Sequence, residues 1–298
     1  ESYNLFYRNN TSFLGNSFAN PFNVSRVNGL GILYPVATVR GSLVFGIGFN
    51  RIHHYDDLMS FSGYSNYNNG MEFPINTDGQ LLYYGFNKDV ERYEKIMSNG
   101  ARDLLTISFG IALSPNLAGG ISVSKMKGLE NYDFEFLQKD IADNYQQFPA
   151  DFQSYEVFQS LKTKTEAWKL RGGVKYIYSP FQFGFSIALP YNVNVVENHG
   201  TQERLIFDNA DYSDTLEFGY YDYKVQMPAT MDLGIAFVTD LNLSFSIAYR
   251  LQDWSKMQFN LMDFSAQSED YTIMSVENDL IEQEYRLVSQ LRVGVEGL

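Results

Sequence analysis

The chain of 298 residues contains no cysteine, and basic residues are scarce relative to acidic ones. Without cysteine, disulfide frameworks, thiol nucleophiles and zinc-thiolate sites are all excluded. There are 22 lysines and arginines against 35 aspartates and glutamates, so the formal net charge is −13. Nucleic-acid binding requires a basic surface, and we therefore expect no nucleic acid among the partners.

Long apolar runs are absent as well. No stretch of about eighteen consecutive apolar residues occurs, so the sequence predicts no transmembrane helix, and no basic-then-apolar signal peptide begins at Glu1. The mean hydropathy of −0.25 resembles that of a soluble protein. In a membrane β-barrel, however, only alternate residues face lipid, so mean hydropathy does not separate the two classes.

What the chain has in abundance is aromatic residues and alternation. It contains 22 tyrosines, 24 phenylalanines and 23 glycines, a mixture that suits strands and turns. Leu43, Phe45, Ile47 and Phe49 alternate with small or polar residues, which is the period of a β-strand. Charges keep to the small-residue side, and this favours a wet interior. The same pattern occurs in residues 105–113, 168–178, 181–189, 230–237 and 241–251.

The connections between these segments alternate in length. Short turns are expected at residues 37–41, 114–116, 179–180 and 239–240. Long polar segments are expected at residues 10–29, 55–102, 127–164, 196–218 and 258–283. Short turns at one end and long loops at the other are typical of outer-membrane barrels. The pattern predicts an all-β, antiparallel, up-and-down transmembrane β-barrel with about ten strands, short periplasmic turns and long outer loops.

Two of the long segments contain helical spacing. We expect short helices at residues 89–98 and 133–145, and in the second Phe134, Leu137 and Ile141 fall on one side. These helices would form an apolar platform outside the barrel or cap its mouth.

Three stretches resemble the FadL/TodX family of outer-membrane transporters, in particular its Bacteroidetes-type relatives. They are GILYPVATVRGSLVFGIGFNR at residues 31–51, AYRLQDWS at residues 248–255, and LRVGVE at residues 291–296. The resemblance covers essentially the whole chain, in the family's order. It implies a barrel of about fourteen strands, of which residues 1–298 would be a partial, single domain without the N-terminal hatch and the last strands. An open sheet would leave unpaired edges in lipid.

The resemblance also implies a function. Members carry hydrophobic compounds such as long-chain fatty acids across the outer membrane of Gram-negative bacteria by passive diffusion and lateral release. By that analogy, the partners are membrane lipid and a hydrophobic small molecule. The capture site would contain Phe134, Phe136, Leu137 and Ile141. The wall opening would lie at Gly46, Gly48 and Asn50, although glycines that relieve barrel curvature would look the same.

Charged residues are expected in the lumen. Lys169, Arg171 and Arg250 would pair with the carboxylate of a ligand or simply balance Asp232. Nothing in the sequence prefers fatty acids to other hydrocarbons.

No catalytic motif stands out, and we expect no enzyme activity, cofactor or metal. His53 and His54 are adjacent, so on a strand they point to opposite sides, and His199 is remote in sequence. The pair Asp56 and Asp57 is expected to be solvated in a polar loop.

Three alternatives stay open. A soluble β-sandwich or a lipocalin-like barrel also alternates, although its outward face is usually charged rather than small. A barrel that serves as partner or shuttle of a protein secretion system would carry a docking patch on its outer loops. A general porin would have a wide, unplugged lumen.

Overall fold

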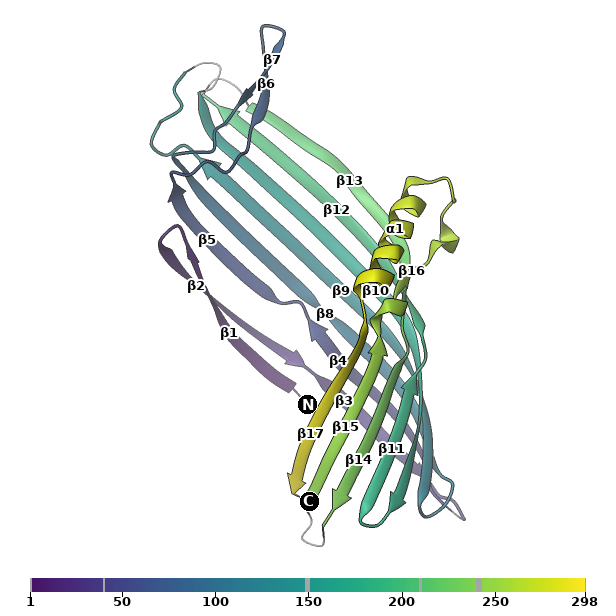
Figure 1. Cartoon of the computed structure of the whole chain (residues 1–298). Coiled ribbons are helices and arrows are strands. Elements are labelled where there is room, and N and C mark those ends of the chain that lie inside the picture. The colour runs from purple at the N-terminus through teal and green to yellow at the C-terminus, as the bar shows by residue number, and fades with distance from the viewer. Residues whose placement is uncertain (1, 40, 148–150, 209–210, 240–242, 298) are drawn as a thin grey trace.

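The computed structural model describes residues 2–39, 41–147, 151–208, 211–239 and 243–297. The predicted all-β class is confirmed, since strands dominate and there is one α-helix. The main sheet contains 13 antiparallel strands and curls, so that β14, β15 and β17 stand in front of β3 and β4 (Figure 1). Within the described ranges, no helix is both long and apolar enough to cross a membrane.

A path of nine neighbouring strands runs through the lower part of this sheet, in the orientation of Figure 1. We call this part of the sheet the lower half and the remainder the upper half. The order along the path is β17 (Leu287–Gly297), β15 (Leu243–Asp253), β14 (Thr230–Val238), β11 (Phe181–Ala188), β10 (Phe152–Tyr178), β9 (Leu117–Lys139), β8 (Val90–Ala112), β4 (Leu43–His54) and β3 (Gly29–Val36). Short connections follow β3, β8, β10 and β14, at the four predicted positions. Of the last turn, residues 240–242 lie outside the described residues.

Three strands are much longer than the others and continue upward. β8, β9 and β10 contain 23, 23 and 27 residues. The second part of β10 pairs with β11, whereas its first part pairs with β12. The strands that join only this upper half are β5 (Asp57–Ser65), β12 (Tyr191–Phe207), β13 (Asp211–Met227) and β16 (Gln258–Phe259).

Two hairpins and a helical segment complete the structure. The hairpin of β1 (Ser2–Phe13) and β2 (Asn16–Val27) contacts β5, and β6 (Phe73–Thr77) pairs with β7 (Gln80–Tyr84). The helical segment contains η1 (Trp254–Lys256), η2 (Leu261–Asp263) and α1 (Glu269–Glu284).

Side chains fasten the first hairpin to β5. The Asn20 Nδ2 donates to the Ser60 carbonyl at 3.0 Å, and the Ser60 hydroxyl donates back to Asn20 Oδ1 at 2.7 Å. Arg26 binds both carboxylate oxygens of Asp56, whose side chain is 1% exposed. The expectation that Asp56 is solvated is therefore wrong, because the hairpin supplies both its cover and its counter-charge.

Both predicted loop helices are wrong. Residues 90–98 belong to β8, and residues 133–139 belong to β9, and in both segments the two strands pair with each other without a break. The aromatic residues Tyr132, Phe134 and Phe136 also alternate, as in a strand. Backbone pairing with the neighbouring strands continues through this segment, and it therefore forms a strand and not a helix. The helix that does occur, α1, lies in the segment expected to be a polar loop.

The two faces of the main sheet differ in burial although no second layer covers them throughout. Ser124, Met126, Thr165 and Ala167 alternate to one face and are buried, while Trp168 on the other face is 62% exposed. In a single curled sheet, only side chains on the concave side converge and shield one another. We call this side the inner face and the opposite side the outer face.

Candidate functional site

Large apolar side chains form a continuous layer on the outer face of the lower half. Across neighbouring strands, the pairing places Ile32 beside Ile47 and Ile47 beside Ile107, so that the alternation is in phase from strand to strand. Towards the β17 end of the strand path, Phe183 lies beside Ile235 and Ile235 beside Ile247 on the same face. Most of these side chains are exposed. We call this surface the apolar band.

Aromatic residues mark the lower border of the apolar band. The strand register aligns Tyr178, Phe181, Phe237 and Phe245 in one row at the end where the short turns lie. The rings of Phe181 and Phe237 lie 5.3 Å apart between centroids. Such a row of aromatic residues at the edge of an apolar surface is typical of a membrane–water interface.

Ion pairs mark the upper border. Register aligns Arg51 with Asp103, Asp103 with Lys127, and Lys127 with Glu166. The Arg51 Nε lies 2.8 Å from Asp103 Oδ1, and the Lys127 Nζ lies 3.5 Å from Glu166 Oε1. On β4, β8 and β10 the lowest charged side chain of the outer face lies in this row, and on β9 it lies one residue pair lower, at Lys125.

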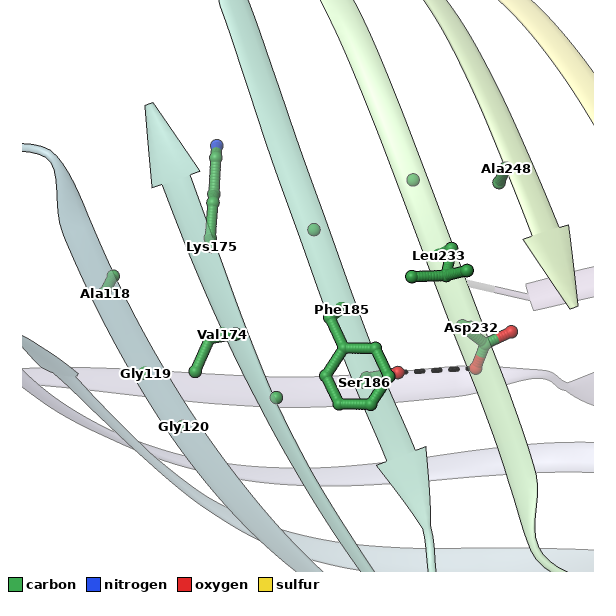
Figure 2. A pocket seen from close by; sticks show the side chains of 13 residues that line it. Ala118, Gly119, Gly120, Val174, Lys175, Phe185, Ser186, Asp232, Leu233 and Ala248 are labelled. Atoms are coloured by element: carbon green, nitrogen blue, oxygen red, sulfur yellow. Dashed lines mark hydrogen bonds between the residues drawn. The ribbon is translucent and has the colours of Figure 1, made fainter. Parts of the chain in front are cut away.

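The inner face of the lower half contains a hollow of about 480 Å³. Small residues make room for it, among them Ala118, Gly120 and Ala248 (Figure 2). Gly184 also lines it. At Gly173 the space is so tight that a Cβ would lie 2.9 Å from the Phe185 carbonyl oxygen, so a larger residue would push neighbouring strands apart. The absence of side-chain bulk is what opens the hollow.

The polar groups of the hollow converge on one carboxylate. The Arg250 Nε donates to Asp232 Oδ1 at 2.6 Å, and an Arg171 terminal nitrogen lies 3.6 Å from Asp232 Oδ2. Figure 2 shows the Ser186 hydroxyl, which donates to Asp232 at 3.3 Å. Lys175 lines the hollow itself, whereas Arg171 and Arg250 lie beside it through their contacts with Asp232. The three basic groups and the one carboxylate together carry a net positive charge.

Lys169 lies at the upper end of this wall and contacts an aromatic ring. Its Nζ is 4.6 Å from the centroid of Tyr191, a cation–π distance. Of the residues expected in the lumen, Arg171, Asp232 and Arg250 are therefore brought together, and Lys169 lies apart from that cluster on the same face.

An apolar cluster lies above the hollow on the inner face. Its buried members Met126, Ala167, Val193 and Val195 come from β9, β10 and β12. The partly buried side chains packed against them are Leu104, Tyr191, Tyr223, Val225 and Met227. The inner face thus changes from charged to apolar within a few residues of each strand.

A second apolar cluster caps the top of the inner face. Phe86, from the segment between β7 and β8, packs against Phe152 at 4.8 Å and against Phe207 at 5.6 Å between ring centroids. Ile75, Val90 and Tyr155 complete the buried set. Gln138 is fully buried and donates to the Phe86 carbonyl, which fixes the segment to β9. We call this cluster the aromatic cap.

The four residues of the predicted capture site do not share one side. Phe134 and Phe136 alternate to the inner face, and Phe136 packs against the aromatic cap. Leu137 points to the outer face, and Ile141 is exposed in the connection after β9. They would form one surface only on a helix, and the segment is a strand.

The predicted wall opening lies within a continuously paired strand. Gly46, Gly48 and Asn50 pair with β3 on one side and β8 on the other. A Cβ at Gly46 would lie 2.5 Å from the Ser108 hydroxyl oxygen, so this glycine permits close packing. The irregular register of β4 is higher, between Arg51 and His53.

The three histidines lie at two separate places. His53 and His54 lie at the end of β4, and His199 stacks on Tyr221 with 5.6 Å between centroids. Within the part of the chain that the structure describes, no three histidine, aspartate or glutamate side chains come close enough together to hold a metal ion.

Comparison with known proteins identifies no relative: the chain matches no protein-family model, no curated protein and no solved structure.

Proposed function

We propose that the lower half of the sheet is part of the wall of an outer-membrane β-barrel in a Gram-negative bacterium. The barrel carries hydrophobic compounds, such as long-chain fatty acids, by passive diffusion and releases them laterally. The observation that carries this proposal is a reversal of polarity within single strands.

β10 illustrates the reversal. In its upper half, Tyr155 and Val157 face inward while Lys162 and Lys164 face outward, as in a water-soluble sheet. In its lower half the order is opposite, because Trp168, Leu170, Val174, Tyr176 and Tyr178 face outward and Arg171 faces inward. β9 reverses at the same level, because Phe134 and Phe136 face inward above it, whereas Ile121 and Val123 face outward below it. One strand in one solvent has no reason to reverse, whereas a strand that passes from water into lipid does.

The height of the apolar band suits a membrane. β3, β11, β14, β15 and β17 contain 8 to 11 residues. A tilted strand of about 9–11 residues crosses the hydrocarbon core. The borders of aromatic residues below and ion pairs above lie where the two interfaces of the bilayer would be.

Strand direction constrains how the proposed barrel closes. Every neighbouring pair along the path of nine strands is antiparallel, so β3 and β17, at its two ends, run in the same direction. Bacterial barrels have an even number of antiparallel strands, and an open edge is not tolerated in lipid. The closed wall therefore takes an odd number of further strands between β17 and β3.

The inner face suits an amphiphilic ligand with an acidic head group. Lys175 and Asp232 line the hollow, and Arg171 and Arg250 lie beside it against Asp232. A carboxylate that enters the hollow therefore has three basic groups and one acidic group nearby, in a chain that is acidic overall. The apolar cluster above the hollow offers a surface for the tail. Apolar walls with a few placed polar groups are typical of binding sites for small molecules.

The test is uptake of labelled oleate by Gram-negative cells that express the protein, compared with cells that lack it. We expect faster uptake with the protein, and a loss of that gain with Arg171→Gln combined with Arg250→Gln. Lys95→Gln combined with Lys139→Gln removes two outer-face charges of the upper half and serves as the matched control. A labelled alkane tests whether the head group matters, since its uptake should not respond to the arginine substitutions.

Two outcomes would contradict the proposal. The first is equal oleate uptake with and without the protein in the outer membrane. The second is unchanged uptake together with loss of protein secretion when the gene is deleted, which would favour a partner of a secretion system.

A further inference from the structure

Four lysines gather on the outer face immediately above the apolar band. Lys125 and Lys127 lie on β9, and Lys162 and Lys164 lie on β10. On the outer face of these two strands, Glu166 is the one acidic side chain in the same rows. Asp103 continues the row of Lys127 on β8, and Arg51 balances it. The chain as a whole has a net charge of −13, so this surplus of positive charge is local.

Glu166 is shared between two of the lysines and neutralises only one charge. Its carboxylate oxygens lie 3.5 Å from Lys125 Nζ and 3.5 Å from Lys127 Nζ. Among the described residues, Lys162 and Lys164 form no ion pair. The Lys125 Nζ also lies 5.5 Å from the centroid of Trp168, the uppermost aromatic residue of the apolar band on β10.

A hollow of about 540 Å³ opens beside these lysines on the outer face. Lys164 and Glu166 line it from β10, Asn194 from β12, and Asp222 and Lys224 from β13. Lys224 is occupied by Asp263, at 2.6 Å. Lys164 therefore faces the hollow together with amide and carboxylate groups that can accept hydrogen bonds from hydroxyls.

We propose that this basic patch, made of Lys125, Lys127, Lys162 and Lys164, binds the phosphate-bearing head group of a lipid in the outer leaflet. The inference rests on the proposed membrane location, because only then do head groups lie at this level. Lysine is a common phosphate ligand, and each basic side chain close to an anionic membrane surface strengthens the attraction about fivefold. Asn194 and Asp222 supply partners for hydroxyl groups of the same head group.

The experiment uses fluorescence of Trp168 as a reporter of nearby lipid. The chain has two tryptophans, so Trp254→Phe leaves Trp168 as the single emitter. The full chain is reconstituted into phosphatidylcholine vesicles that contain, at equal mole fraction, either brominated phosphatidic acid or brominated phosphatidylcholine. Bromine quenches tryptophan on contact, so stronger quenching by phosphatidic acid reports its enrichment at the patch.

We expect stronger quenching by brominated phosphatidic acid than by brominated phosphatidylcholine. Lys127→Gln combined with Lys164→Gln removes two such side chains and should lower the preference for phosphatidic acid about 25-fold. Lys88→Gln combined with Lys139→Gln removes the same charge from exposed upper positions and should leave the preference unchanged.

Two results would overturn the proposal in distinguishable ways. Equal quenching by both brominated lipids would show that Trp168 touches lipid without selection of phosphate, which removes the binding site and leaves the membrane location standing. No quenching by either lipid would remove the membrane location as well.

Discussion

The upper and lower halves of β10 obey opposite rules although they belong to one strand. Above Ala167, apolar side chains such as Tyr155 face inward and lysines face outward; below it, Trp168 and Leu170 face outward and Arg171 faces inward. Strand propensity and alternation are the same in both halves. On the proposed membrane location, what differs is the solvent around each half, and the level of the reversal marks where water gives way to lipid.

The two halves are also held together differently. The upper half has a dry core, the aromatic cap, in which Phe86, Phe152 and Phe207 are almost fully buried. The lower half has a hollow and a cluster of charges where such a core would be. The lower half is therefore stabilised by the backbone hydrogen bonds between its strands and by the contacts of the apolar band with its surroundings. Substitutions should therefore have different effects in the two halves.

The largest effect is expected at Phe86, which is 1% exposed. Phe86→Ala leaves a cavity among the rings of the aromatic cap and should lower the free energy of unfolding by about 3–5 kcal/mol. Phe158→Ala, on the outer face of the same half, removes a ring that is 39% exposed and should cost about 1 kcal/mol. Denaturant unfolding of both variants measures the difference. Equal losses would mean that the upper half is not built around its inner face.

The next effect tests the solvent of the lower half. Ile107 lies in the middle of the apolar band on β8 and is 61% exposed, so Ile107→Arg would cost little in water. In a bilayer, an arginine at mid-depth on the lipid face costs about 2–4 kcal/mol. Met97→Arg, on the same strand and face but in the upper half, should be nearly neutral in either case. Unfolding from lipid vesicles distinguishes these outcomes, and two equal, small effects would contradict the contrast between the halves.

Alternation made the lower half predictable from the sequence. Segments such as 42–50 and 105–113 carry bulky residues on one side and small ones on the other, and no other regular structure fits that period. The short turns at residues 114–116 and 179–180 are equally predictable, because a proline interrupts the alternation in each of them. The cluster of Arg171, Asp232 and Arg250 could be anticipated because the three residues share the small-residue side.

The strands of the upper half could not be predicted from the sequence, because apolar and polar residues alternate less regularly there. Lysines and glutamates on its outer face and mixed residues on its inner face resemble a polar loop, and the spacing of Phe134, Leu137 and Ile141 imitates a helix. These segments form strands because β8, β9 and β10 continue to pair with one another above the lower half. The local sequence pattern does not reveal that pairing. For α1 a signal was present: Ser268 accepts a hydrogen bond from the Tyr271 amide, with Glu269 and Asp270 in the first turn.

The smallest effect concerns the one hydroxyl in the aromatic cap, that of Tyr155. Burial, and to a lesser degree the negative charge of Glu203, raise the pKa of Tyr155 from its ordinary value of 10.0 to about 12. A pKa raised in the folded state favours the protonated form, so the contribution is fully present below pH 10 and is lost as the pH rises towards 12. That loss amounts to about 2 kcal/mol, and it should be missing in Tyr155→Phe. Tyr83→Phe, which removes an exposed hydroxyl from β7, is the matched control and should follow the unmodified protein. The measurement is the free energy of unfolding across this pH range. Parallel curves for Tyr155→Phe and the unmodified protein would contradict the prediction, because the interior of the upper half would then be as accessible to water as its surface.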